Sequence, residues 1–320
     1  MGFHVCGFRI QVAHNSVRKL ASNTGTFGIM TTTIVPNIWC NGNARELAEF
    51  YTEVFRNTRV IGSQQYPTEG LPDFQKDMAG KDVTVDIEID GLPMTLINAD
   101  DTFRPNPALG FMVNFDPAQF EDAEKYLDLA YEKLKDGGRV LMELGEYPFS
   151  KKYAWVEDKA GVNWQLIMTR PENDPRPHII PAFMFCGQAQ GKCAEAVDYY
   201  CEVIPKSEVG RRVMYPHSPN EVMFSEFQLA GQWFTAMDSG VPQDFSFVGG
   251  VAMLINAKDQ EEIDYLWSKL AAQEQPCGWC VDKFGVAWEI IPENFGELMA
   301  APGAYETMMG MTKIEIAEFG

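Results

Sequence analysis

Alternating apolar and polar residues mark two related strands, one near the middle of the chain and one near its end. Residues 156–167 read VEDKAGVNWQLI, and residues 281–291 read VDKFGVAWEII. In each stretch an Asp-Lys pair and a glycine favour a turn, and the residues that follow alternate as on a strand. One face of each predicted strand is apolar, whereas the other carries a single polar side chain, Gln165 or Glu289. We therefore look for any chemistry of the chain near these two positions.

The repetition extends far beyond these strands. Each copy has a strand, an amphipathic helix and three more strands, and then the same order again, with hairpins that turn at glycines. The segments that carry this pattern in the first copy are 36–42, 44–55, 83–91, 93–100, 110–116, 120–134 and 156–167. Those in the second copy are 181–187, 196–203, 222–231, 232–239, 250–257, 261–270 and 281–291. The pattern predicts four modules of order β-α-β-β-β.

These segments divide the chain into two domains with three further parts. We expect a leader at 1–31, a first domain at 32–170, a linker at 171–177, a second domain at 178–292 and a C-terminal tail at 293–320. The linker reads PENDPRP, which is stiff and charged. The leader contains basic but no acidic residues, a composition shared by transit peptides and by disordered leaders, and both interpretations stay open.

Charge and composition narrow the class of partner. The 320 residues carry a net charge of −19, which disfavours a nucleic-acid partner because phosphate backbones attract clustered Lys and Arg. No apolar run approaches the roughly 20 residues that cross a bilayer, so we expect no membrane partner. Seven scattered cysteines make a poor disulfide framework and favour the reducing cytoplasm.

Several segments together resemble a known family. PNIWCNGNARELAEFYTEVF, DKAGVNWQLI, QWFTAMDSGVPQDFSF, CGW and DKFGVAWEIIP are similar to the PhnB-like branch of the vicinal oxygen chelate superfamily, across about residues 32–292. That superfamily includes glyoxalase I and the bleomycin-resistance proteins, and members of this branch are often labelled demethylubiquinone methyltransferase-like.

The resemblance implies an α+β fold with tandem glyoxalase-like domains. Each domain would consist of two β-α-β-β-β modules that form an incompletely closed eight-stranded sheet. Relatives with one domain commonly form homodimers, so the resemblance implies that the two domains pair within this chain. A homodimer of the whole chain stays open.

The same resemblance raises the question of a metal. It implies a ligand on the last strand of each domain, at Gln165 and Glu289, but the first-strand ligands would fall at or beside Pro36 and Pro181. Proline has no metal-binding side chain, and none of the four histidines has a partner at ligand spacing. We therefore predict no metal and no other cofactor, and we expect His178 on the surface.

Strand alternation predicts which polar side chains share the concave face of each sheet. The candidates are Asp86, Glu88, Asn163 and Gln165 in the first domain, and Glu226, Gln228 and Glu289 in the second. Of these, Glu289 and Glu226 are the candidate catalytic carboxylates, since a carboxyl in an apolar cavity can become a general base. The others are candidate ligand-binding residues, with Phe103 and Phe245 from loops at the cavity mouth. The strand tryptophans, Trp164 and Trp288, are expected in the core.

Three functions fit these features. The first is a metal-independent enzyme that acts on a small metabolite, with Glu289 as the base. The second is a binding or sequestering protein of the bleomycin-resistance type, which needs only a shaped cavity. A methyltransferase fits less well, because the sequence contains no G-x-G-x-x-G turn for a nucleotide cofactor. The sequence does not name the ligand.

Overall fold

The computed structural model describes residues 32–66, 68, 71, 73–170, 172, 174–301 and 303–320. The predicted leader and part of the predicted linker lie outside the described residues. None of the described helices is long and apolar enough to cross a membrane.

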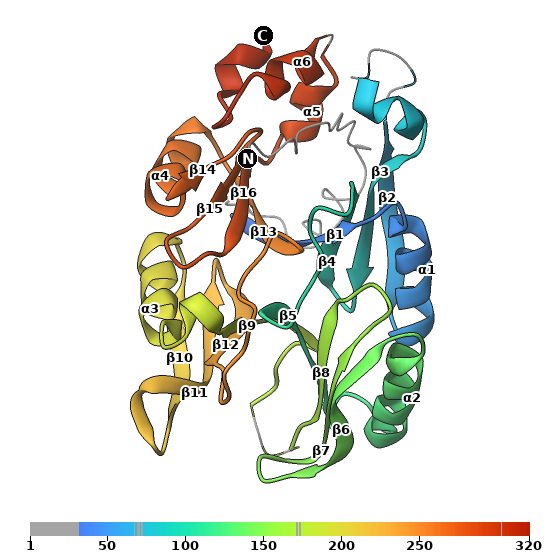
Figure 1. The fold of residues 1–320 in the computed structure, drawn as a ribbon, viewed down its shortest axis with the longest axis vertical. Coiled ribbons are helices and arrows are strands. Elements are labelled where there is room, and N and C mark those ends of the chain that lie inside the picture. The colour runs from blue at the N-terminus through green and yellow to red at the C-terminus, as the bar shows by residue number, and fades with distance from the viewer. Residues whose placement is uncertain are drawn as a thin grey trace, which may run out of the picture.

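Four modules of order β-α-β-β-β follow one another along the chain, as the pattern predicts (Figure 1). The first module contains β1 (Thr33–Cys40), α1 (Ala44–Val54), β2 (Thr58–Gln65), the 3-10 helix η2 (Asp73–Met78), β3 (Asp82–Ile89) and β4 (Leu92–Asn98). The second contains β5 (Leu109–Phe115), α2 (Ala123–Lys135), β6 (Arg139–Tyr147), β7 (Ser150–Glu157) and β8 (Asn163–Met168). The third contains β9 (Ile179–Phe185), η3 (Gly187–Ala189), α3 (Cys193–Val203), β10 (Glu208–Tyr215), β11 (Ser218–Leu229) and β12 (Gln232–Asp238). The fourth contains β13 (Val251–Ala257), α4 (Gln260–Leu270), β14 (Gln273–Glu274), β15 (Trp279–Val281) and β16 (Ala287–Pro292).

The modules form two eight-stranded sheets, which confirms the α+β class. Sheet A has the strand order β14-β15-β16-β13-β1-β4-β3-β2, and sheet B has the order β10-β11-β12-β9-β5-β8-β7-β6. Sheet A therefore joins the first module to the fourth, and sheet B joins the second to the third. This differs from the expectation that both modules of a sheet belong to the same half of the chain.

The difference has a physical reason. Within each module the strands lie in the order β1-β4-β3-β2 or its equivalent. The first strand is therefore an outer strand of its module, and its free edge pairs with the first strand of another module. The pairs are antiparallel, with Ile34 opposite Ile255 and Phe111 opposite Pro181. All four first strands offer the same kind of edge, so the local pattern does not decide which of them pair.

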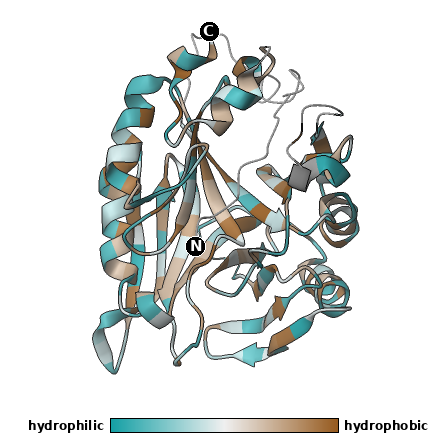
Figure 2. Cartoon of the chain, turned by 45° about the horizontal axis from the view of Figure 1, so that its top comes forward, coloured by the Kyte–Doolittle hydropathy of each residue, from teal (hydrophilic) through white to brown (hydrophobic). Residues whose placement is uncertain are grey.

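The hydrophobic cores follow the halves of the chain instead. One core lies beneath α1 and α2 and draws almost entirely on the first two modules, and another beneath α3 and α4 draws on the last two. Figure 1 shows these two pairs of helices on opposite sides of the molecule, and Figure 2 shows mostly hydrophobic strands between them. Trp164 and Trp288 are fully buried in these cores, as predicted. The first and second modules thus share a core, the second and third share sheet B, the third and fourth share the other core, and the fourth and first share sheet A. The four modules therefore close into a ring.

A buried aspartate in each half reinforces this ring. Asp282 accepts hydrogen bonds from the Tyr200 hydroxyl (2.6 Å), the Trp288 indole N–H (2.9 Å) and two backbone N–H groups. Asp158 does the same with Tyr51 (2.8 Å) in place of Tyr200. Tyr51 and Tyr200 belong to the first and third modules, whereas Asp158 and Asp282 belong to the second and fourth. Each network therefore connects a module of sheet A with a module of sheet B.

The prediction that His178 lies on the surface is wrong. Its side chain is only 2% exposed and lies against the rings of Phe115 and Phe120. The backbone N–H of Asn114 donates to the carbonyl of His178, so the residue already belongs to the pairing at the centre of sheet B. Its Nδ1 lies 3.5 Å from a carboxylate oxygen of Asp90.

The C-terminal tail covers part of the concave side of sheet A. It contains α5 (Phe295–Met299), α6 (Ala304–Met309) and η4 (Ile316–Phe319). Its buried side chains form one apolar cluster with residues of the concave face, and the members of this cluster include Ile97, Trp279, Ala287, Ile291, Phe295, Met299, Tyr305, Met308 and Phe319. The tail therefore packs on both modules of sheet A.

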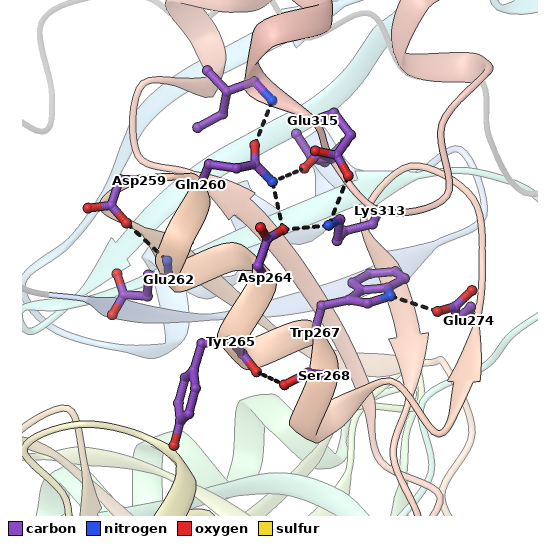
Figure 3. Close-up of polar contacts among 12 residues, drawn as sticks. Asp259, Gln260, Glu262, Asp264, Tyr265, Trp267, Ser268, Glu274, Lys313 and Glu315 are labelled. Atoms are coloured by element: carbon purple, nitrogen blue, oxygen red, sulfur yellow. Dashed lines mark hydrogen bonds and ion pairs between the residues drawn. The ribbon is translucent and has the colours of Figure 1, made fainter.

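Polar contacts fasten the tail to α4 (Figure 3). The Gln260 side chain donates to the carbonyl of Ile314 (3.0 Å) and accepts from the N–H of Ile316 (2.8 Å). Lys313 forms ion pairs with Asp264 and Glu315. We call these contacts the tail clamp.

Candidate functional site

Glu289 lies on the concave face of sheet A. Trp288 and Ile290, on either side of it in β16, pack into the core beneath α4, so the alternation of the strand turns Glu289 the opposite way. Its side chain is 7% exposed, and its Oε2 accepts a hydrogen bond from Nδ2 of Asn37 at 2.7 Å. Asn37 comes from β1, two strands away in the sheet order. The first and fourth modules therefore build this site together.

Burial changes the proton affinity of this carboxyl. It raises the pKa of Glu289 from 4.5 to about 8, because the carboxylate loses its hydration, whereas the hydrogen bond from Asn37 acts in the opposite direction. Glu289 is therefore mostly protonated at neutral pH, and it can both donate and accept a proton near that pH.

Further polar side chains extend the site across the sheet. Asn37 lies opposite Thr95 of β4, and the Thr95 hydroxyl donates to Oδ1 of Asp86 in β3 at 2.8 Å. Burial raises the pKa of Asp86 as well. Glu88 is two residues further along β3 and pairs with the exposed Arg59 at 2.9 Å. A polar row thus crosses the concave face from Asp86 to Glu289, and we call it the sheet A floor.

An aromatic cavity lies beside this floor. Its volume is about 290 Å³, and two of its lining residues adjoin Glu289 directly. Trp279 is the cross-strand neighbour of Glu289, and Ala287 precedes it on the same strand face. The other lining residues include Trp39, Phe103, Phe247, Val248 and Pro276. Glu289 does not itself line this cavity, and the lining suits a small apolar or aromatic ligand.

The matching place in sheet B has a different chemistry. The repeated motifs PNIW and PAFM align Asn37 with Ala182, and the closing motifs align Glu289 with Gln165. Gln165 is buried and accepts a hydrogen bond from the Tyr153 hydroxyl at 2.9 Å. This place therefore has no titratable carboxyl and no amide on its first strand.

The second candidate carboxylate also belongs to sheet B. Glu226 accepts a hydrogen bond from Nε of Arg176 at 2.7 Å, and the same guanidinium lies 4.0 Å from the ring centre of Trp233. Gln228, on the same strand, donates to Glu208 at 3.0 Å. Glu226 is thus ion-paired and lies in a different sheet from Glu289.

The structure regroups the residues that the sequence assigned to each half. Sheet A holds Asp86, Glu88 and Glu289, whereas sheet B holds Asn163, Gln165, Glu226 and Gln228. The reason is the pairing of modules across the two halves. Phe103 lines the sheet A cavity, whereas Phe245 packs beside Met184 and Cys186 near sheet B.

Two polar residues of the floor were not among the sequence-based candidates. Asn37 directly follows Pro36, the position compared with a metal ligand, so strand alternation from that proline could have found it. Thr95 gives little signal on its own, because its role follows from the register that places it between Asn37 and Asp86.

The residues at this site do not fit a divalent metal ion. The described residues contain no group of three or more His, Cys, Asp or Glu side chains placed to hold one. Glu289 has an amide as its side-chain partner, whereas a divalent site needs three or four convergent donors. The metal prediction itself stays a prediction.

Comparisons with known proteins give the family. A protein from Bacillus cereus, titled a putative 3-demethylubiquinone-9 3-methyltransferase and PhnB protein, is 28% identical, covers 42% of this chain and 98% of its own, and has a TM-score of 0.37. Glyoxalase I from Zea mays is 12% identical, covers 84% and 96%, and has a TM-score of 0.53, which shows a shared fold. A putative dioxygenase from Bacillus subtilis is 14% identical, covers 88% and 91%, and has a TM-score of 0.46.

No curated protein matches the chain. A family model described as 3-demethylubiquinone-9 3-methyltransferase matches residues 32–167 and again residues 177–291. The two matches together span most of the chain and repeat the tandem organisation of the sequence. The chain therefore belongs to this family, as a tandem protein with the fold of the glyoxalase superfamily.

Proposed function

We propose that the chain binds a small metabolite on the sheet A floor and that Glu289 exchanges a proton with it without a metal ion. The observation that supports this most is the state of Glu289: a buried carboxyl with a pKa near 8 beside an aromatic cavity of about 290 Å³. A proton-transfer group works best when its pKa lies near the working pH.

The residues of the floor divide the work. Neutral Glu289 donates its proton to an oxygen or nitrogen of the ligand, and the resulting carboxylate then recovers a proton to close the cycle. The aromatic walls and the tail limit the access of water, which strengthens the interaction between the ligand and these polar groups. Glu226 takes no part in this proposal, because it lies in sheet B and is ion-paired with Arg176.

One observation favours a second function, ligand binding without turnover. Sheet B offers buried Gln165 with Tyr153, which can hydrogen-bond a ligand but contain no group that titrates near neutral pH. Methyl transfer, which the family description mentions, receives less support, since the sequence contains no G-x-G-x-x-G turn.

The test combines a ligand screen with one substitution. Small metabolites are screened by thermal shift, and those that bind are incubated with the protein and followed by NMR for turnover. Glu289→Gln keeps the shape and the contact with Asn37 but removes the proton, so turnover should fall roughly 10²–10⁴-fold.

The matched control is Glu261→Gln, which makes the same change at an exposed position of α4. It should leave turnover unchanged. Normal turnover by the Glu289→Gln variant would contradict the proposed role, and binding without turnover in the unsubstituted protein would favour the second function.

A further inference from the structure

Asn37 is buried, and only one end of its side chain has a partner. The residue is 2% exposed, and its Nδ2 donates to Oε2 of Glu289 at 2.7 Å. Its Oδ1 is also buried and has no hydrogen-bond partner. Buried amide oxygens normally have partners, because a polar group that loses its hydration without one costs about 1–3 kcal/mol. Asn37 does not itself line the cavity, but it lies two residues before the lining residue Trp39 on the same face of β1, so its unpartnered Oδ1 is a candidate acceptor for a ligand.

The contact also determines which oxygen of Glu289 carries the proton. A neutral carboxylic acid has one oxygen with a proton and one that only accepts. The N–H of Asn37 points at Oε2, so Oε2 is the accepting oxygen and the proton belongs on Oε1. Asn37 thus orients the proton of Glu289 as well as its side chain.

Sheet B supplies an internal comparison. Ala182 stands where Asn37 stands, and Gln165 stands where Glu289 stands, with its oxygen bonded to Tyr153 instead. Both members of the amide–acid pair are therefore replaced together in the matching place. The fold therefore does not require this pair at both places, which supports a joint role of Asn37 and Glu289 on the sheet A floor.

We propose that Asn37 is the positioning residue of this site: it holds the proton of Glu289 on Oε1 and presents Oδ1 to a donor group of the ligand. The inference rests on the proposed function of Glu289 and narrows its ligand class. The ligand would be a small neutral molecule with a hydrogen-bond acceptor for Oε1–H and an O–H or N–H group close to it. An anion would meet oxygen atoms at Asn37, Asp86 and Glu289, which disfavours it.

The proton affinity of Glu289 gives a test that needs no turnover. The hydrogen bond from Asn37 favours the charged carboxylate, so Asn37→Ala should raise the pKa of Glu289 by about one unit. Other titratable or charged groups lie on the elements packed around the floor, and they include Asp82, Asp86, Glu88 with its partner Arg59, Tyr66, Glu297 and Tyr305. All of them stay in place in the variant.

The measurement is a carbon-13 NMR titration of the glutamate carboxyls in the full chain, with the Glu289 signal assigned from its absence in Glu289→Gln. Thr95→Val is the matched control, because it removes a neighbouring polar group of the floor and leaves the Asn37 contact intact. If Asn37→Ala does not fold, Asn37→Leu, which has a similar shape, takes its place. A normal pKa of Glu289 in the unsubstituted protein overturns the proposed function, whereas a pKa near 8 that ignores Asn37 overturns only the role of Asn37.

A pair of probes tests the ligand class. 2-Pyridone has a carbonyl acceptor next to an N–H donor on a flat ring, and N-methyl-2-pyridone lacks the donor. The protein should bind 2-pyridone roughly tenfold more tightly than the methylated probe, and Asn37→Ala should lose this preference. Equal binding of the two probes, or no binding of 2-pyridone, overturns the assignment of Oδ1 as a ligand acceptor.

Discussion

Replacing Glu289 by glutamine should make the protein more stable, and increasingly so as the pH rises. The folded chain keeps the Glu289 proton up to a pKa of about 8, whereas the unfolded chain releases it near 4.5. Between these values the folded state binds more protons than the unfolded state, so the free energy of unfolding falls as the pH increases. This loss in the free energy of unfolding is absent below pH 4.5 and complete above pH 8.

The size of the effect follows from the shift. Each pKa unit corresponds to about 1.4 kcal/mol, so the whole window amounts to about 5 kcal/mol, and about 3 kcal/mol of it is reached by pH 7. Glutamine has no proton to release and keeps the contact with Asn37. Asp86 titrates in both proteins and largely cancels from their difference.

Urea unfolding followed by tryptophan fluorescence at pH 5 to 9 measures this difference. The stability advantage of Glu289→Gln should grow by about 4 kcal/mol between pH 5 and pH 8 and then level off. Glu261→Gln, at an exposed position, controls for the loss of one negative charge. Parallel profiles for the unsubstituted protein and Glu289→Gln would show that burial does not shift this carboxyl, and the reasoning would fail.

Three further predictions concern other parts of the molecule. Asp282→Asn should lower the free energy of unfolding by about 3 kcal/mol in urea titrations, because an amide N–H₂ replaces a carboxylate oxygen that accepts hydrogen bonds from buried donors. Tyr200→Phe should lower it by only about 1 kcal/mol, and equal losses would contradict this reasoning. Combined Gln260→Ala and Lys313→Ala should release the tail clamp and speed chymotrypsin cleavage within 293–320 at least roughly tenfold. Circular dichroism should show that α4 is still folded, and unchanged cleavage would show that apolar packing alone holds the tail. Elemental analysis after dialysis should find well under one zinc or nickel per chain, and a stoichiometric metal would overturn the metal prediction.

The local features of this fold could be predicted from the sequence, whereas the partners of its edges could not. Strand alternation placed Trp164 and Trp288 in the cores and Glu289 on the opposite face, because side-chain direction on a strand depends only on neighbouring residues. The choice of β13 as the partner of β1 depends on contacts more than 200 residues apart, which no local pattern encodes. For the same reason, Glu226 looked like a partner of Glu289 until the sheets were known.

The ring of modules has a consequence for how the two sites can diverge. In a symmetric pair of identical single repeats, both sheets would have the same sequence, and every substitution would appear in both sites at once. Joining the repeats in one chain removes this constraint, because each of the four modules occurs once and contributes to one sheet only. Sheet A can therefore contain an acid and its amide while sheet B contains a glutamine and an alanine at the matching positions. Assembly of both sheets also becomes a first-order process, so dilution alone does not take either of them apart.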